Sequence, residues 1–558
     1  MNWKMCSVNT AAFVLCLGVV CTGAQIQVPA DYPTIQVAIE AAADGDAIIV
    51  APGLYVENVE TIQERAVILT SEDPTDPDTV AQTIIDGNGV KPCVTVPYGG
   101  EAVIAGFTIT NGSSLMGLGG INCLGGHATV VNNMILSNLA GGVYATGATV
   151  IQNMIADNQM YGGVVSLYSA VVTDNIVAGN VSLVYTGGID VVGASNHITG
   201  NVVSCNKGAN GGGIGCSSAE SLITDNTIIG NESYLGAGIW CRWGGPVIAD
   251  NLIADNKAYL SDTETKASGG GIACEDSSPT IIGNVIVRNE AQWGGGIFCT
   301  GSSSKPTIMN NLIAGNKAAV MGGAIALREG AAPSFAANTM VYNRSKQYGG
   351  GVVAVKSQAS LVDCILWGNS APTGPELVLA NTAEVTVKHC NIAGGQSAAF
   401  LTEGCTLAWG AGNIDADPLF VDTGRWDDAG TPGDASDDVF ILGDYRLLPG
   451  SPCIDAGTND VDNPATPDVE ALPDMDLAGI ARIIDGDLDG TATIDIGAYE
   501  YLPGDVNYDG KVNILDLISV RNSLGKDAAS DPAARRCDVN NDGAVNVLDI
   551  IVVRNQLK

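Results

Sequence analysis

A six-residue phrase recurs along the middle of this chain, and it constrains the fold more than any other feature. It begins and ends with Asn and encloses four residues that are mostly apolar or small. Nine copies start at Asn133, Asn153, Asn175, Asn201, Asn226, Asn251, Asn284, Asn311 and Asn338, and a tenth starts at Cys364. Successive copies lie 20 to 33 residues apart, and a repeat of this length predicts a solenoid.

The residues between the phrases indicate which solenoid forms. Each repeat holds Gly-Gly steps and short apolar runs such as residues 279–282, and no apolar stripe of helix length. Three short β-rich runs per repeat predict a parallel β-helix with three strands per coil. Asn side chains stacked at equivalent corners satisfy corner backbone groups by hydrogen bonds. We therefore expect the repeated Asn residues to point inward in a structural role.

Five repeats share the pattern Gly-Ile-x-Cys. Ile and Cys two positions apart lie on one face of a strand, so both should point into the core. Stacked cysteines would be about 4.8 Å apart with parallel Cβ atoms, an unfavourable disulfide geometry. We expect a column of buried thiols rather than disulfides or a metal ladder. The cysteines are Cys123, Cys216, Cys241, Cys274 and Cys299.

The first 24 residues are predicted to be an export signal. Lys4 supplies a positive start, residues 11–20 an apolar run, and Ala24 a small residue for cleavage. Later apolar runs are too short to span a membrane. We expect a secreted or extracellular, cell-surface-associated protein.

The charge balance limits the partners. The chain has 558 residues and a formal net charge of −35. Nucleic acid requires basic patches, so this balance argues against nucleic-acid binding. An acidic polysaccharide would be repelled unless Ca²⁺ bridged the two acidic surfaces.

The amino-terminal region is predicted to close one end of the solenoid. Residues 34–43 form an expected amphipathic helix with Ile35, Ala38 and Ile39 on one face, and residues 47–50 start the first strand. Such a helix covers open strand edges. Here the sequence resembles the right-handed parallel β-helix proteins of the pectin-lyase-like class. The resemblance implies an all-β right-handed parallel β-helix over residues 25–412, and it does not fix an activity.

Residues 413–502 differ in composition. Positions 413–501 contain nineteen Asp and two Glu but three Arg, which favours bound cations. The segment resembles a choice-of-anchor closing domain. Residues 485–490 imitate a Ca²⁺ loop, but Ile496 stands at loop position twelve instead of an acid. Both a cation site and an acidic loop without one remain open.

Two twelve-residue loops near the carboxyl end have the spacing of Ca²⁺ ligands, with Gly at position six and each leading into a similar apolar helix. The ligand positions, including a carbonyl at position seven, are Asp505, Asn507, Asp509, Lys511, Asn513 and Asp516 in the first loop and Asp538, Asn540, Asp542, Ala544, Asn546 and Asp549 in the second.

This duplicate resembles a type I dockerin, which implies a small all-α Ca²⁺-binding module over residues 503–558 and a cohesin-bearing partner. Loop positions ten and eleven carry Ile514-Leu515 and Val547-Leu548 in place of the hydroxyl pairs of the best-known dockerins, so the cohesin class stays open. The alternative is a tail stabilised by Ca²⁺ without a partner.

Catalytic candidates come from the position before each phrase. If the Asn points inward, this residue should point outward. Asp225 and Asp250 occupy it on consecutive coils, about 5 Å apart by strand spacing. Such a pair can share a proton, hold Ca²⁺ or divide acid and nucleophile roles. The alternative is a solvated polar corner, since Asp suits turns.

Aromatic residues near the Gly-Gly steps are candidates for substrate binding. Tyr161, Trp293 and Tyr348 lie at such steps, and exposed aromatic rings can stack on sugars. The alternative is packing over turn glycines. Two functions follow: a secreted enzyme that degrades a polysaccharide, as a lyase or glycoside hydrolase, or a non-catalytic cell-surface binding or scaffold protein. In both, the dockerin attaches the β-helix to an assembly.

Overall fold

The computed structural model describes residues 23–114, 119–125, 127–193, 195–259, 267–431, 437–459, 472–528 and 531–557. Two compact units, Met1–Ala273 and Cys274–Lys558, divide the chain, and each is described by itself. The predicted export signal lies almost entirely outside the described residues. Within the described ranges, no helix is both long and apolar enough to cross a membrane.

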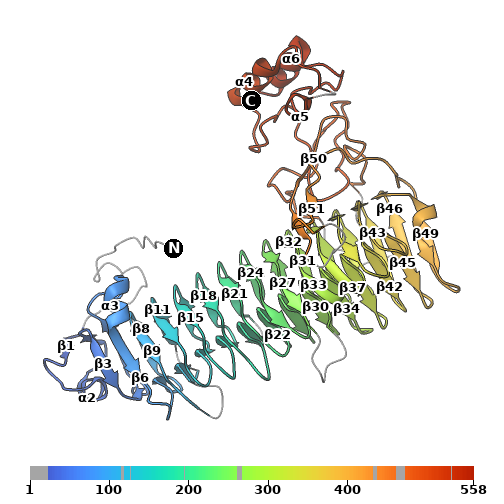
Figure 1. The fold of residues 1–558 in the computed structure, drawn as a ribbon. Helices are drawn as coiled ribbons and strands as arrows, with labels where there is room; N and C mark the ends of the chain where they lie inside the picture. Colours follow the sequence, from blue (N-terminus) through green and yellow to red (C-terminus); the bar gives the residue numbers. More distant parts are fainter. Residues whose placement is uncertain are drawn as a thin grey trace. The chain divides into compact units, whose positions relative to one another are not determined.

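The first unit is a parallel β-solenoid whose coils each contribute strands to three columns (Figure 1). The first column contains β1 (Gln25–Val28), β2 (Asp46–Val50), β5 (Ala66–Ser71), β8 (Glu101–Ala105), β11 (His127–Val131), β14 (Thr149–Ile151), β17 (Val171–Thr173), β20 (His197–Thr199), β23 (Leu222–Thr224) and β27 (Val247–Ala249). The second contains β3 (Gly53–Val56), β6 (Thr83–Asp86), β9 (Thr108–Thr110), β12 (Met134–Leu136), β15 (Met154–Ala156), β18 (Ile176–Ala178), β21 (Val202–Ser204), β24 (Thr227–Ile229) and β28 (Leu252–Ala254). The third contains β4 (Val59–Glu60), β7 (Val94–Val96), β10 (Ile121–Cys123), β13 (Val143–Thr146), β16 (Val164–Leu167), β19 (Ile189–Val192), β22 (Ile214–Ser217) and β26 (Ile239–Arg242).

Short elements complete this unit. They are β25 (Glu232–Ser233), which pairs with β29 (Lys257–Ala258), and the helices α2 (Ile35–Ala41) and α3 (Pro77–Gln82). The α2 helix begins after the cap Thr34 and buries Ile35, Ala38 and Ile39 at the end of the solenoid, as expected. The prediction that the first strand starts at residue 47 is wrong, because β1 precedes it and pairs with β2 through Gln25 and Ala47.

The second unit repeats this pattern and adds the closing segment and the carboxyl-terminal helices, while β30 (Ile272–Glu275) spans the division. Its first column contains β31 (Thr280–Ile282), β35 (Thr307–Met309), β39 (Ser334–Ala336), β43 (Gln358–Val362), β46 (Glu384–Lys388) and β49 (Thr406–Trp409). The second contains β32 (Val285–Val287), β36 (Leu312–Ala314), β40 (Thr339–Val341), β44 (Ile365–Trp367) and β47 (Asn391–Ile392). The third contains β34 (Ile297–Thr300), β38 (Ile325–Arg328), β42 (Val352–Val355), β45 (Leu377–Ala380) and β48 (Phe400–Leu401).

The remaining elements of the second unit are short. They are β33 (Glu290–Trp293), β37 (Lys317–Met321), β41 (Arg344–Ser345), the 3-10 helix η1 (Gln396–Ala398), the antiparallel pairs β50 (Phe420–Asp422) with β53 (Asp444–Leu447) and β51 (Arg425–Asp427) with β52 (Val439–Ile441), and the helices α4 (Ile514–Ser523), α5 (Pro532–Arg535) and α6 (Val547–Gln556).

Two buried Asn ladders hold the coils together, one at each end of the second column. In the first unit, Asn133 donates from its backbone N and its Nδ2 to Asn153 Oδ1 at 2.9 and 3.0 Å. Asn138 and Asn158 repeat this pair of bonds at the next corner. Asn251 is buried as well, which confirms the predicted inward direction. Each amide thereby satisfies backbone groups that no strand partner reaches.

Both ladders change chemistry in the last coils of the solenoid in the second unit. In one, Asn338 is followed by Cys364, whose backbone N lies 3.4 Å from Cys390 Sγ. In the other, Asn369 donates from N and Nδ2 to the two carboxyl oxygens of buried Glu376, at 3.1 and 2.6 Å. Burial raises the pKa of Glu376 to about 8. A carboxyl group thus takes the place of the next amide oxygen.

The Ile and Cys positions are buried in the core, as the alternation predicts. Within the described residues, every cysteine is a free thiol. Cys216 and Cys241 are register partners on neighbouring strands, so the predicted thiol column without disulfides is confirmed.

Candidate functional site

The first predicted Ca²⁺ loop is folded around its own carboxylates. Asp505 accepts from Asp509 N at 3.1 Å and from Gly510 N at 2.8 Å. Asp516 accepts from the backbone N of Asn507 and of Asn513 at 3.2 and 2.8 Å. Gly510 has a φ of 82°, the left-handed conformation that makes position six a glycine.

The second loop repeats these bonds. Asp538 accepts from Asp542 N at 3.0 Å and from Gly543 N at 2.9 Å, and Asp549 accepts from Asn546 N at 2.8 Å. In both loops position nine, Asn513 or Asn546, is the N-cap of the following helix and forms a capping box with position twelve. The same side chains therefore end the loop and begin the helix.

The donor set fits Ca²⁺, a hard cation that prefers oxygen ligands. Each loop offers three Asp, two Asn and the carbonyl of Lys511 or Ala544. Burial raises the pKa of Asp505, and the charges of Asp516 and Asp509 raise it further. Burial and neighbouring Asp charges act likewise on Asp538. A bound cation would relieve this repulsion.

The two loop-helix repeats share one small apolar core. Val506, Val520, Ala534, Cys537, Val545 and Val553 form it. Loop positions ten and eleven stay outside this core: Ile514, Leu515, Val547 and Leu548 are 62%, 54%, 63% and 54% exposed. Each repeat thus presents an exposed apolar pair on the first turn of its helix.

Loop position four attaches the first loop to the closing segment. Tyr508 donates from its hydroxyl to Leu447 O at 3.1 Å, and Arg446 Nη1 donates to Tyr508 O at 2.7 Å. The guanidinium groups of Arg446 and Arg536 lie 4.6 and 5.3 Å from the centre of the Tyr508 ring. The module thus contacts the closing segment through side chains as well as through the chain connection at residues 502–504.

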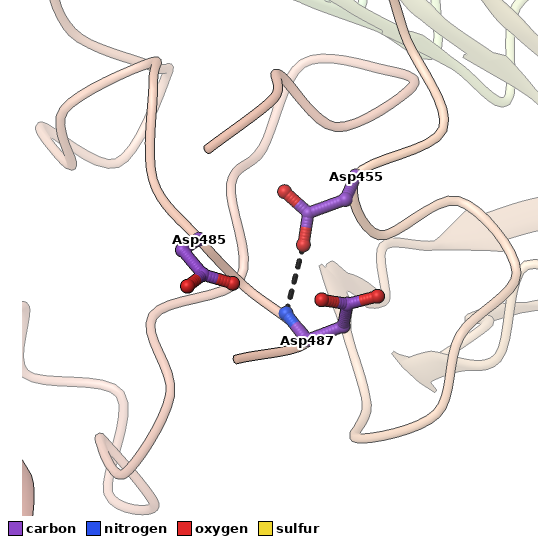
Figure 2. Close-up of side chains that lie close together, drawn as sticks. All are labelled: Asp455, Asp485 and Asp487. Atoms are coloured by element: carbon purple, nitrogen blue, oxygen red, sulfur yellow. Dashed lines mark hydrogen bonds between the residues drawn. The ribbon is translucent and has the colours of Figure 1, made fainter. Parts of the chain in front are cut away.

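Three carboxylates of the closing segment converge. Asp455, Asp485 and Asp487 have oxygen atoms within 4.8 Å of one another. Figure 2 shows Asp487 N donating to Asp455, at 2.7 Å. The loop over residues 485–490 supplied the sequence signal for two of them, whereas Asp455 lies thirty residues upstream and has no motif of its own. Asp455 and Asp485 are half-buried, and Asp487 is exposed.

Asp225 and Asp250 lie at adjacent corners of the first unit, and both are exposed. Asp225 N donates to Ala249 O at 3.2 Å, and partial burial together with the charge of Asp225 raises the pKa of Asp250. Their φ angles are 57° and 56°, a left-handed corner that Asp tolerates better than most residues. Both the catalytic and the polar-corner interpretations predict this geometry.

In the second unit, the prediction that the residue before each phrase points outward to solvent is wrong, because the closing segment covers this corner. Asn310 and Asp363 are buried there. Arg482 binds Asn310, and it also donates to Glu500 Oε1 at 2.8 Å. Asp363 Oδ1 accepts from Thr458 N at 3.0 Å, and burial raises the pKa of Asp363 to about 8.

The aromatic candidates differ in exposure. Trp293, Met321 and Tyr348 are register partners on successive coils. Trp293 is half-buried beside Phe298, and Arg328 lies 4.2 Å over its ring, whereas Tyr348 is 43% exposed. Packing against Phe298 and Arg328 therefore accounts for much of the burial of Trp293.

In the first unit, half-buried Tyr161 stacks on exposed Tyr185, with ring centres 6.4 Å apart. This pair leaves aromatic surface available to a ligand.

Comparison with known proteins locates two regions. Residues 503–558 match the family model of the Dockerin type I domain, and residues 119–340 match that of the Right handed beta helix region. No curated protein matches the chain. The chain therefore contains a right-handed β-helix region and a carboxyl-terminal type I dockerin domain.

Two solved structures are weakly similar. Pectate lyase Pel9A is 12% identical, with 86% of this chain and 96% of that chain covered and a TM-score of 0.34. The catalytic domain of GH87 alpha-1,3-glucanase in complex with nigerose is 13% identical, with 70% of this chain and 69% of that chain covered and a TM-score of 0.33. At this level the similarities say nothing about activity.

Proposed function

We propose that this protein, a right-handed β-helix joined to a type I dockerin domain, is an exported component of a multi-protein assembly and acts on a polysaccharide. The dockerin attaches it to a cohesin-bearing partner in a Ca²⁺-dependent manner. The observation that carries the proposal is the duplicated loop, with the same carboxylate bonds and the same capping box in both copies.

The dockerin surface suggests how the partner is recognised. Leu515 and Leu548 occupy loop position eleven and are both 54% exposed, next to Ile514 and Val547. The partner surface should therefore be apolar, and binding should depend little on salt, because apolar contacts are not screened.

Capture by cohesins tests the attachment. A panel of immobilised cohesins, with Ca²⁺ and with EDTA, should retain the full chain only with Ca²⁺. Asp505→Ala with Asp538→Ala should abolish retention, because each removes position one of a loop. Lys511→Ala is the matched control, since position seven supplies only its carbonyl. Retention that persists in EDTA contradicts Ca²⁺ dependence.

Two replacements separate the partner contact from the Ca²⁺ site. Leu515→Asp with Leu548→Asp should lose cohesin capture and keep Ca²⁺ binding. If the double variant keeps both cohesin capture and Ca²⁺ binding, the proposal of an apolar interface is contradicted. Loss of Ca²⁺ binding would show that these leucines support the fold of the loops.

The catalytic alternative rests on Asp225 and Asp250. Carboxyl groups about 5 Å apart suit a retaining glycosidase. The pKa of Asp250, which burial and the charge of Asp225 raise, suits a general acid. The non-catalytic alternative rests on the left-handed corners, which explain Asp without chemistry.

Activity on neutral and acidic glycans, with and without Ca²⁺, separates these alternatives. Asp225→Asn with Asp250→Asn should abolish turnover and preserve binding if the pair is catalytic. If the wild-type protein binds a glycan without turnover, it is a binding or scaffold protein. Trp293→Ala and Tyr348→Ala test whether their edge contributes to binding.

A further inference from the structure

One corner position of the first unit carries an exposed aromatic residue on every third coil. It lies one or two residues after the strands of the third column, and the strand register aligns it from β7 to β26. The aligned residues are Tyr98, Gly125, Gly147, Tyr168, Gly193, Ser218 and Trp243. Two small residues therefore separate each aromatic residue from the next.

The aromatic side chains lie on the surface rather than in the core. Tyr98, Tyr168 and Trp243 are 74%, 61% and 57% exposed. A Cβ added at Gly125 would come within 2.9 Å of the Tyr98 ring, and one added at Gly193 within 2.5 Å of the Tyr168 ring. Each tyrosine thus lies over the glycine of the following coil, which leaves the opposite ring face to solvent.

The backbone at this corner does not favour bulky residues. Tyr168 and Trp243 have φ angles of 43° and 56°, in the left-handed region that costs most side chains about 1 kcal/mol or more. Gly147 and Gly193 occupy the same position without that cost. Large side chains retained in an unfavourable conformation indicate a role for their exposed surface.

The fold itself does not require aromatic residues here. In the second unit, the register aligns the corresponding corner through Gly301, Glu329, Lys356 and Asn381. These residues are small, charged or polar. The aromatic row is therefore a feature of the first unit's surface.

The spacing of the row suits a linear ligand. Neighbouring parallel strands are about 4.8 Å apart, so aromatic residues three coils apart are about 14 Å apart. Three pyranose rings of an extended glycan cover a similar length. Aromatic faces pack against the C–H faces of sugar rings without requiring charge. With a net charge of −35, the protein disfavours an anionic chain.

Trp243 is also held in place. The guanidinium of Arg242 lies 3.8 Å from the centre of its ring. This stacking contact covers one face of the indole and restricts its orientation. An ordered ring loses less side-chain entropy on binding.

We infer that Tyr98, Tyr168 and Trp243 form a contact row for an extended neutral polysaccharide. Each ring stacks on one sugar, and neighbouring rings contact sugars that are three positions apart along the chain. This inference rests on the proposed polysaccharide function and specifies its ligand and surface. Binding by several weak contacts in a row should increase steeply with chain length.

The test uses the full-length protein and gel retention on soluble xylan, mannan and mixed-linkage β-glucan, with polygalacturonate as the charged comparison. The wild-type protein should be retained by at least one neutral glycan. Each single Ala replacement should weaken retention about two- to tenfold, and the triple replacement should abolish it. Tyr98→Phe should bind like wild type, and Leu54→Ala, at an exposed leucine of β3, is the control.

Oligosaccharides from the retaining glycan, three and seven sugars long, should bind weakly and strongly respectively. The thermal midpoint of each variant shows whether it is folded. Retention of the folded triple variant at the wild-type level overturns the contact row and leaves the proposed function intact. Retention on polygalacturonate alone overturns the neutral ligand. A wild-type protein that binds none of these glycans contradicts the row and the proposed function together.

Discussion

Replacement of Asn226 by Leu tests the amide ladder that joins the coils of the first unit. Asn226 Oδ1 accepts from Asn201 N and Nδ2 at 2.9 and 3.0 Å. Its Nδ2 donates to Ile198 O and Thr224 O, both at 2.9 Å, and to Asn251 Oδ1 at 3.0 Å. Leu is close to Asn in size and can make none of these bonds.

The cost follows from the groups left behind. The buried backbone N–H of Asn201 would lose its acceptor, at about 1–3 kcal/mol, and two carbonyl oxygens would each lose a bond of about 1 kcal/mol. The apolar side chain returns about 1–2 kcal/mol through burial. We expect Asn226→Leu to lower the free energy of unfolding by about 1–4 kcal/mol.

Urea unfolding of the full chain, followed by far-UV circular dichroism, measures this loss. Gln159→Leu is the control, because Gln159 is an exposed amide and its replacement should change stability by less than about 0.5 kcal/mol. If Asn226→Leu unfolds at the same urea concentration as this control, the ladder does not stabilise the coils, and the structural role of the repeated Asn is wrong.

Three further outcomes are expected. Stability should fall as pH rises from about 4.5 to about 8, because the pKa of Glu376 is raised from 4.5 to about 8 and the folded state keeps a proton that the unfolded chain releases. Glu376→Gln should reduce the slope of the urea midpoint against pH, and buried Asp363, whose pKa is also raised to about 8, should keep part of that slope; an unchanged slope contradicts the assignment. Tyr508→Ala should increase protease cleavage at residues 502–504, because it removes the hydroxyl bond to Leu447 and the ring beside Arg446; unchanged cleavage would show that these contacts do not hold the module. Cys216→Ala should lower the free energy of unfolding, measured by heat and urea, by about 1 kcal/mol or less, because the thiol acts as a small buried hydrophobe. The other cysteines should remain free thiols in this variant. A much larger loss of stability would indicate that Cys216 is bonded to another group.

Much of the fold was predictable from local patterns. The Asn phrases recur along the second column, with one Asn at each end of its strands, and the alternation of Ile and Cys determines which face of a strand is inward. The burial of Asn251 and Cys216 therefore follows from sequence spacing alone. The Ca²⁺ loops were equally accessible, because all ligands of one loop lie within twelve residues. In each case, the residues that define the feature are close together in the chain.

Features made by distant segments were not predictable. The strand β1 is short and is recognisable only through its pairing with β2. Asp363 is buried because Thr458, far along the chain, covers its corner. The row of Tyr98, Tyr168 and Trp243 emerges only from the strand register, since coils of unequal length hide its period in the sequence.

The most direct test of the Ca²⁺-dependent attachment is circular dichroism of residues 503–558 during Ca²⁺ titration. This fragment contains both loops and the apolar core between them. Because clustered carboxylates repel one another without a cation, we predict loss of helical signal in EDTA, recovery with Ca²⁺, and no recovery in Asp505→Ala with Asp538→Ala. An unchanged helical signal in EDTA, or full recovery in the double variant, would contradict the Ca²⁺ loops on which the proposed attachment depends.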